Sequence, residues 1–284
     1  MSNPENKTGI TSPTIGVFDS GFGGLTVLRA LMAQLPRARF VFFGDTARLP
    51  YGSKSRRTIA RYAAQCAQFL VSQQGAEFLV IACNTASALA LDAIQDAVQV
   101  PVLGVIEPGA EAARSASRTG DVLVIATDAT VQSHAYAAAC RARGLRALEK
   151  ACPLLVPLVE EGWTDHQVTA EVIRIYLDEL NAEAAAQGMN PDVLLLGCTH
   201  YPLLRSLLES AVPVGMNIID SADATAEAAL KLVGTEKRPP NAQFPSAQDQ
   251  VRCFATDSVE KFERLGSRFL NRTTGKVELV DLGG

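Results

Sequence analysis

Two of the six cysteines occupy the same kind of local setting, which points to chemistry rather than packing. Cys83 follows the apolar run 78–82, and Cys198 follows the apolar run 193–197, about one domain length further along the chain. Polar residues come directly after each of them. A thiolate can remove a proton from one face of a carbon while a thiol returns a proton to the opposite face. We therefore interpret Cys83 and Cys198 as an acid–base pair that inverts a carbon centre without a cofactor.

Such a reaction needs further groups, because general acid–base catalysis contributes only about 10²–10⁴-fold. Asp19, at the end of the first predicted strand, and His200, two residues after Cys198, are placed to manage protons. Fixed donors must also hold the charges of the substrate and stabilise the developing carbanion. The residues at suitable strand ends or loops for this task are Ser20, Gly52, Asn84, Thr85 and Thr199.

The basic thiol of the pair needs its thiolate stabilised, because a free cysteine has a pKa of about 8.5. Helix N-termini favour thiolates, and each of the two cysteines precedes a predicted helix, 86–98 in one case and a helix from about residue 203 in the other. We expect these helices to favour the thiolate. The remaining thiols are interpreted as packing residues: Cys66, Cys140, Cys152 and Cys253.

Short apolar runs alternate with helical patterns nearly throughout the chain, which predicts an α/β fold with mostly parallel sheets. Open α/β sheets bind ligands at the carboxyl ends of their strands, so we expect both cysteines at such an edge. The predicted strands are 14–18, 39–43, 78–82, 100–103, 121–126, 145–148, 193–197, 217–220, 252–255 and 276–280. The predicted helices are 25–35, 55–73, 86–98, 108–117, a stretch after 127–130 that ends near 143, 152–161, 167–181, a helix from about 203, 222–232 and 258–268. An exposed loop is predicted at 234–250.

Composition excludes several classes of function. The 284 residues are 48% hydrophobic and 20% charged with a net charge of −4, so no electrostatic footprint suggests direct nucleic-acid binding. No apolar run approaches the roughly 18 residues of a membrane span. The polar start of the chain lacks the apolar core of a signal peptide, which favours a disordered tail at 1–13 and a cytoplasmic protein with reduced cysteines. Three scattered histidines favour no metal site, and the absence of phosphate-binding glycine motifs favours no nucleotide cofactor.

Four segments, in order along the chain, resemble glutamate racemases and, less closely, the wider aspartate/glutamate racemase group. They are IGVFDSGFGGLT (15–26), GDTARLPYG (44–52), ACNTAS (82–87) and LGCTHYPLL (196–204). The resemblance implies a cofactor-independent enzyme that interconverts L- and D-glutamate and supplies D-glutamate for peptidoglycan synthesis and cell shape. One departure lies at 127–130, which reads TDAT where many members have Thr-x-Gly-Thr.

The resemblance also implies roles for individual residues. Cys83 is expected to deprotonate D-glutamate and Cys198 to deprotonate L-glutamate. Asp19, His200 and Glu160 are expected to assist these proton transfers. The residues expected to bind the substrate are Asp19, Ser20, Pro50, Tyr51, Gly52, Asn84, Thr85, Thr130, Thr199 and His200.

The family fold implies two pseudo-symmetric α/β lobes that face each other across the active site. One lobe would comprise 14–106 plus 221–284 and carry Asp19 and Cys83. The other would comprise 107–220 and carry Glu160 and Cys198. The resemblance further implies a homodimer and allows a peptidoglycan precursor or DNA gyrase as a regulatory partner.

Two alternatives stay open. The first is a racemase of the same superfamily that acts on aspartate, a hydantoin or another small substrate. The second is a non-catalytic ligand-binding or regulatory protein on the same scaffold, although the presence of both thiols favours catalysis.

Overall fold

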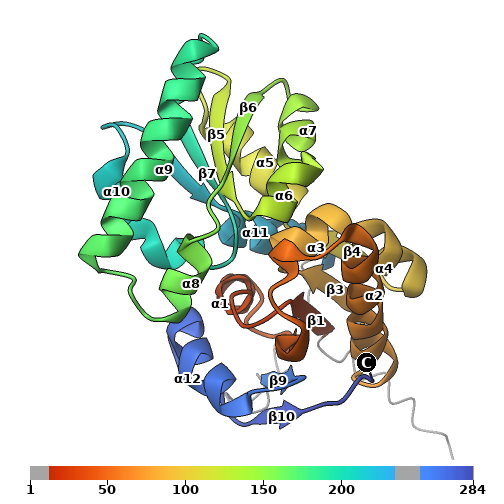
Figure 1. Ribbon diagram of the computed structural model, residues 1–284. Helices are drawn as coiled ribbons and strands as arrows, with labels where there is room; N and C mark the ends of the chain where they lie inside the picture. The colour runs from red at the N-terminus through yellow and green to blue at the C-terminus, as the bar shows by residue number, and fades with distance from the viewer. Residues whose placement is uncertain (1–12, 234–249, 284) are drawn as a thin grey trace, which may run out of the picture.

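Two parallel sheets form the framework of the computed structural model, which describes residues 13–233 and 250–283 (Figure 1). Every strand pair in these residues is parallel. The α/β fold predicted from the alternation of apolar runs and helical patterns is therefore confirmed. The predicted tail 1–13 and the predicted loop 234–250 lie, except for residues 13 and 250, outside the described residues.

The first sheet combines the start of the chain with its end. Its strands are β1 (Thr14–Asp19), β2 (Arg39–Gly44), β3 (Phe78–Ile81), β4 (Val102–Gly104), β9 (Val251–Ala255) and β10 (Val277–Leu279). They are arranged in the order β10–β9–β2–β1–β3–β4. Both β1 and β3 are buried along their whole length, as expected for the central strands of a sheet with helices on both faces. Their carboxyl ends therefore meet at one edge.

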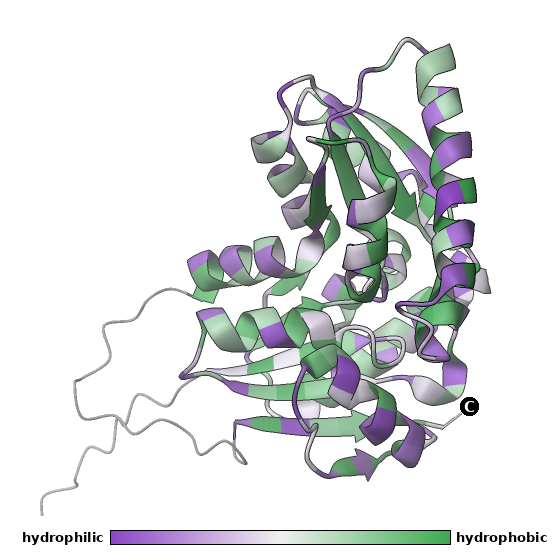
Figure 2. Ribbon diagram, turned by 90° about the vertical axis from the view of Figure 1, so that its left-hand side faces the viewer, coloured by the Kyte–Doolittle hydropathy of each residue, from purple (hydrophilic) through white to green (hydrophobic). Residues whose placement is uncertain are grey.

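The second sheet consists of β5 (Asp121–Ala126), β6 (Arg146–Ala151), β7 (Val193–Gly197) and β8 (Asn217–Asp220). The strands are arranged in the order β6–β5–β7–β8. Side chains of β7 alternate between two hydrophobic clusters, with Leu194 and Leu196 in one and Val193 and Leu195 in the other. This alternation explains why the run is apolar throughout, because both faces of the strand are covered. Figure 2 shows the strands of this sheet as a hydrophobic layer between helices with polar outer surfaces.

Helices cover both sheets. The helices are α1 (Leu25–Gln34), α2 (Arg56–Ser72), α3 (Asn84–Leu89), α4 (Leu91–Ala97), α5 (Ile106–Ala116), α6 (Asp128–Ser133), α7 (Ala135–Arg141), α8 (Leu155–Glu160), α9 (Gln167–Ala186), α10 (Arg205–Ala211), α11 (Ser221–Val233) and α12 (Val259–Leu270). Three short 3₁₀ helices complete them: η1 (Thr46–Arg48), η2 (Tyr51–Ser53) and η3 (Tyr201–Leu204). Helix α11 packs against both α1 and α5 and so joins the layers of the two sheets.

Two predicted helices are each divided in the structure. The stretch predicted as a helix over 86–98 forms α3 and α4, with a break at Ala90, and α3 begins two residues earlier because the Cys83 sulfur accepts the N–H of Ala86. The stretch predicted to end near 143 forms α6 and α7, separated by His134 in the left-handed region with φ 53°. The helix predicted from about 203 begins as η3 and becomes α-helical at Arg205.

The return of the C-terminal segment to the first sheet is present in the structure, where β9 pairs with β2 and β10 pairs with β9. The predicted lobe boundaries fall near the ends of elements. Helix α5 begins at Ile106, and α11 begins at Ser221 directly after β8. Division of the chain into lobes of 14–106 plus 221–284 and 107–220 stays a prediction.

Candidate active site

A pocket of about 340 Å³ lies where the carboxyl ends of the two sheets face each other, and both Cys83 and Cys198 line it. This volume is typical of a site for a small molecule. From the first sheet and its loops the pocket is lined by Ser20, Gly21, Leu49, Pro50, Tyr51, Gly52, Ser53, Cys83, Asn84 and Thr85. From the second sheet and its loops it is lined by Thr127, Asp128, Pro153, Val156, Pro157, Glu160, Glu161, Cys198, Thr199 and His200.

The structure brings nearly all of the residues predicted for the site to this pocket. Asp19 and Thr130 are the two that do not line it, and both are buried directly behind residues that do. The sequence reasoning did not assign a role to several lining residues, including Thr127, Asp128 and Val156. These come from the loop after β5 and from the segment after β6, so the rule that ligands bind at the carboxyl ends of strands was a signal that could have found them.

Cys83 is the N-cap residue of α3, and its sulfur accepts a hydrogen bond from the N–H of Ala86 at 3.4 Å. Its thiol donates to Ser20 Oγ, also at 3.4 Å. Burial and the neighbouring charge of Asp19 raise the pKa of Cys83 to about 12. The N–H of Ala86 at the start of α3 does lower the pKa of Cys83, as expected of a helix N-terminus, but burial and the like charge of Asp19 outweigh this contribution.

Cys198 does not stand at the N-terminus of an α-helix, since only the 3₁₀ helix η3 follows it. Its sulfur instead lies 3.9 Å from Nδ1 of His200. The neighbour that could influence the Cys198 thiol is therefore the imidazole of His200 and not the N-terminus of an α-helix. This contact with an imidazole distinguishes the surroundings of Cys198 from those of Cys83, which has the backbone N–H of Ala86 and the hydroxyl of Ser20 as neighbours.

His200 is buried and connects Cys198 to Glu160. Burial alone lowers the pKa of His200, but the contacts with Cys198 and Glu160 outweigh burial and raise the pKa to about 10. Nε2 lies 3.4 Å from Oε1 of Glu160. His200 and Lys261 in turn lower the pKa of Glu160 against the opposing effect of burial. His200 therefore lies between the sulfur of Cys198 and the carboxylate of Glu160.

The raised pKa of His200 predicts a specific dependence of stability on pH. Because the folded-state pKa of His200 lies above its ordinary value of 6.5, protonated His200 stabilises the fold fully below pH 6.5, and that contribution is lost as the pH rises toward 10. The difference in unfolding free energy between the wild type and His200→Gln should therefore shrink over this range in urea titrations. A constant difference from pH 6 to 10 would contradict the protonated imidazole, and ¹⁵N NMR of the ring at pH 8 provides an independent check.

Three hydroxyls bridge the two sheets beside the pocket. Thr85 Oγ1 lies 3.0 Å from Thr127 Oγ1 and 3.2 Å from Thr130 Oγ1, and the latter two are 2.9 Å apart. Thr127 lines the pocket, whereas Thr130 is fully buried behind it. Within this cluster Thr127 is thus better placed than Thr130 to touch a ligand, and Thr130 can orient the other two. A substrate-binding role for Thr130 stays a prediction.

Tyr51 is held in place by a carboxylate at the end of β2. Its hydroxyl donates to Asp45 Oδ2 at 2.5 Å, and Thr256 Oγ1, from the C-terminal segment, donates to Oδ1 at 3.0 Å. Burial raises the pKa of both Tyr51 and Asp45. The Pro50-Tyr51-Gly52 turn is therefore fixed by the first sheet as a wall of the pocket.

Three buried polar atoms have no hydrogen-bond partner among the described residues: Asp19 Oδ1, Asn84 Nδ2 and His200 Nε2. All three belong to side chains at this site. Buried polar groups are almost always satisfied in folded proteins. Nε2 of His200 already faces the carboxylate of Glu160, so Asp19 Oδ1 and Asn84 Nδ2 are the acceptor and the donor that indicate a ligand. Such a ligand must itself carry both a donor and an acceptor.

Asn84 owes its orientation to Tyr136, whose hydroxyl donates to Asn84 Oδ1 at 2.6 Å from the opposite sheet's layer. This bond leaves Nδ2 free for a ligand. Tyr136→Phe should therefore raise KM for the substrate about tenfold and change kcat less, as measured by steady-state kinetics. Tyr62→Phe, which removes the hydroxyl of a half-buried α2 residue that does not line the pocket, is the control. An unchanged KM in Tyr136→Phe would show that Asn84 is oriented by other contacts.

The described residues contain no group of three His, Cys, Asp or Glu side chains that could hold a metal ion. In the same part of the chain, no helix has the length and apolar character of a membrane span. All six cysteines are buried and unbridged.

Comparisons with known proteins agree on one family. The model of the "Asp/Glu/Hydantoin racemase" family matches residues 15–229. The glutamate racemase of Koribacter versatilis is 53% identical over 290 residues, covering 96% of this chain and 98% of that protein. The solved structure of glutamate racemase isoform RacE1 from Bacillus anthracis has a TM-score of 0.85 at 35% identity, covering 96% of this chain and 98% of that one. The Francisella tularensis enzyme in complex with D-glutamate has a TM-score of 0.84 at 35% identity and the same coverage.

Proposed function

Because the chain belongs to the Asp/Glu/hydantoin racemase family, and within it to the glutamate racemases, we propose that it inverts glutamate with Cys83 and Cys198 as the two proton carriers. The chain is accordingly an isomerase. The observation that carries the two-thiol proposal is that Cys83 from the first sheet and Cys198 from the second sheet line the same pocket, with Nδ1 of His200 3.9 Å from the sulfur of Cys198.

The proton transfers balance without any added reagent. The Cys198 thiolate takes the α-proton of the substrate and becomes a thiol, and the electron pair of the broken C–H bond remains on the α-carbon. The Cys83 thiol then gives its proton to the opposite face of that carbon and becomes a thiolate. Exchange of protons with water through neighbouring groups resets the pair. With Cys198 as the thiolate and Cys83 as the thiol, the enzyme is ready to invert L-glutamate, because Cys198 is predicted to deprotonate that enantiomer.

The unpartnered atoms supply the binding groups of this proposal. Asp19 Oδ1 can accept from the α-ammonium of glutamate, and Asn84 Nδ2 can donate to a carboxylate. Burial raises the pKa of Asp19, and a nearby ammonium favours its carboxylate form. The hydroxyls of Thr85, Thr127 and Thr199 add neutral donors for the second carboxylate and for the enolate-like charge that develops in the transition state.

Two alternative functions are compared with the racemisation of glutamate. Aspartate or a hydantoin would use the same thiols, but the curated relatives with 41–53% identity are named glutamate racemases, and the Francisella tularensis enzyme is described in complex with D-glutamate. A non-catalytic binding protein would need neither thiol. We therefore favour turnover of glutamate.

The proposed role is the supply of D-glutamate for peptidoglycan and so for cell shape. The presence of six reduced cysteines supports action in the cytoplasm. A homodimer, a regulatory peptidoglycan precursor and an interaction with DNA gyrase stay predictions.

Incubation of the protein with each glutamate enantiomer in D₂O, with no cofactor added, tests the function. Optical rotation and α-deuterium content are followed together. Inversion of both enantiomers with one deuterium at the α-carbon supports the proposal. Inversion of aspartate but not glutamate would transfer the proposal to the alternative substrate, and binding of labelled glutamate without turnover would favour the non-catalytic protein.

A further inference from the structure

Helix α12, from the C-terminal segment of the chain, brings a cation to the Cys198 side of the pocket. Lys261 Nζ lies 3.1 Å from Oε2 of Glu160, whose other oxygen lies 3.4 Å from His200 Nε2. Figure 1 shows α12 next to α8, which carries Glu160. With the 3.9 Å contact between His200 and Cys198, the side chains of Lys261, Glu160, His200 and Cys198 form one continuous line of contacts that ends at the sulfur of Cys198.

The position of Lys261 is fixed by aromatic packing beneath it. The buried Phe269 ring of α12 meets the imidazole of His200 edge-on, with ring centroids 5.1 Å apart. Phe22, in the glycine-rich turn after β1, packs against both Phe262 and Phe269. The ammonium of Lys261 lies 5.7 Å from the centroid of the Phe22 ring, a cation–π distance. Helix α12 therefore supports the imidazole and the carboxylate from one side.

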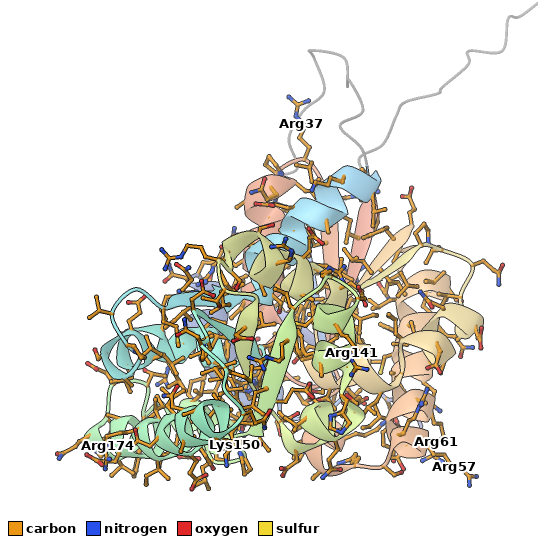
Figure 3. The ribbon with its side chains drawn as sticks, turned by 90° about the horizontal axis from the view of Figure 1, so that it is seen from above. Arg37, Arg57, Arg61, Arg141, Lys150 and Arg174 are labelled. Carbon is orange, nitrogen blue, oxygen red and sulfur yellow. The ribbon has the colours of Figure 1, made fainter. Side chains whose placement is uncertain are left out.

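Lys261 differs from the cations on the outer surface. Arg57 and Arg61 extend outward from α2, and Arg174 extends outward from α9 (Figure 3). The Lys261 side chain is 41% exposed, but its partner Glu160 is only 17% exposed. A charge-assisted contact to a carboxylate in that environment is stronger than an exposed ion pair.

We propose that Lys261 is a positioning residue for the reaction: its ammonium holds the Glu160 carboxylate in the orientation that keeps His200 against the Cys198 sulfur. This inference rests on the proposed function and deepens it. Lys261 itself does not touch the substrate pocket. It acts on one of the two proton transfers, because the line of contacts leads to Cys198 and not to Cys83.

A variant that slows only the proton transfer by Cys198 cannot be recognised from kcat/KM alone. The two enantiomers have equal free energy, so kcat/KM is the same in both directions for the wild type and for every variant. The primary isotope effect measured with α-deuterated substrate instead shows which of the two proton transfers has become slower. If removal of the proton by Cys198 becomes slower, the isotope effect grows for the enantiomer that Cys198 deprotonates and declines toward unity for the other.

The test compares Lys261→Met, Lys261→Arg and the wild type on α-deuterated L- and D-glutamate. We expect Lys261→Met to lose about tenfold in kcat/KM and to show different isotope effects for the two enantiomers. The larger isotope effect should belong to the enantiomer that Cys198 deprotonates. That enantiomer is identified as the one that still exchanges its α-proton in the Cys83→Ser variant. Lys261→Arg keeps the positive charge and should restore the wild-type isotope effects. Lys276→Met, which removes an exposed lysine in the same segment, should leave both rate and isotope effects unchanged.

Isotope effects are ratios within one protein preparation, so partial unfolding of a variant does not alter them. Equal changes for both enantiomers, or an arginine variant that behaves like the methionine variant, would overturn the positioning role. A wild type that inverts no glutamate would instead refute the proposed function, which makes the two failures distinguishable.

Discussion

Cys198→Ser is expected to lose inversion of glutamate in both directions by about 10³-fold or more, and Cys83→Ser is expected to lose it equally. A serine hydroxyl is far less acidic than a thiol and forms no useful base at neutral pH. Each direction of the reaction uses both residues, one as base and one as acid, so removal of either stops inversion. Steady-state polarimetry with each enantiomer measures this loss.

The two serine variants should differ in exchange, although they agree in inversion. In D₂O the thiol that remains can still remove and return the α-proton on its own face. Cys83→Ser should then label only the enantiomer that Cys198 deprotonates, predicted to be L-glutamate, and Cys198→Ser should label only the other. Proton NMR of the recovered substrate resolves the two cases.

A remote thiol provides the matched control for these variants. Cys253 is buried in β9, and its sulfur donates to the carbonyl of Thr274, a bond that a serine can also make. Cys253→Ser should retain inversion. Substantial inversion by Cys83→Ser or Cys198→Ser would refute the two-thiol mechanism.

Gly23→Ala is the second change with a large expected effect. A Cβ atom on Gly23 would lie 2.6 Å from Nδ1 of His200 and closer still to the hydroxyl of Thr199. The first turn of α1, which follows directly, contacts the same loop through Thr26, whose hydroxyl donates to the carbonyl of Thr199 at 3.3 Å. The added methyl must therefore push the loop after β7 away from the loop after β1.

We expect this displacement to reduce kcat/KM by about 10²-fold, since misplacement of catalytic groups by about 1 Å can cost that much. His200 would lose its contact geometry with Cys198, so kcat should fall more than KM rises. Coupled-assay kinetics and a thermal melt of the same preparation separate the loss of activity from loss of folding.

Gly21→Ala is the control within the same turn. A Cβ atom on Gly21 would lie 3.4 Å from Leu49 Cδ2 and 3.9 Å from Asp19 Oδ2, which is ordinary van der Waals contact. This variant should retain most of its activity, although Gly21 also lines the pocket. Similar losses in Gly21→Ala and Gly23→Ala would show that the turn needs glycine for another reason than the approach of the two sheets.

Much of the fold could be predicted from the sequence, because its signals are local. The runs 15–18 in β1, 122–126 in β5 and 193–197 in β7 contain no polar side chain, which is typical of strands buried on both faces. The strand-to-helix transitions after β3 and β7 then place Cys83 and Cys198 at carboxyl ends of parallel strands. The candidate reaction follows from two thiols in that setting, and most of the predicted site residues line the pocket.

The breaks within helices could not be predicted from periodicity. The apolar pattern continues across Ala90 and His134, while the backbone changes direction at both residues. Helices α3 and α6, which end at these two breaks, pack against each other across the two sheets. Such packing involves residues distant in sequence, so no local pattern reports it.

The pKa values of the site residues and the contacts that hold their side chains depend on the tertiary structure. Burial and Asp19 together raise the pKa of Cys83 despite its position at a helix start, and this balance depends on which side chains surround the sulfur. Lys261 reaches Glu160 across 101 positions of the chain, and Tyr136 reaches Asn84 across 52. Residue type and strand position are local features, so the sequence alone predicts which residues carry the proposed chemistry. The protonation states of these residues depend on the tertiary structure, because electrostatic interactions act through space between residues distant in sequence.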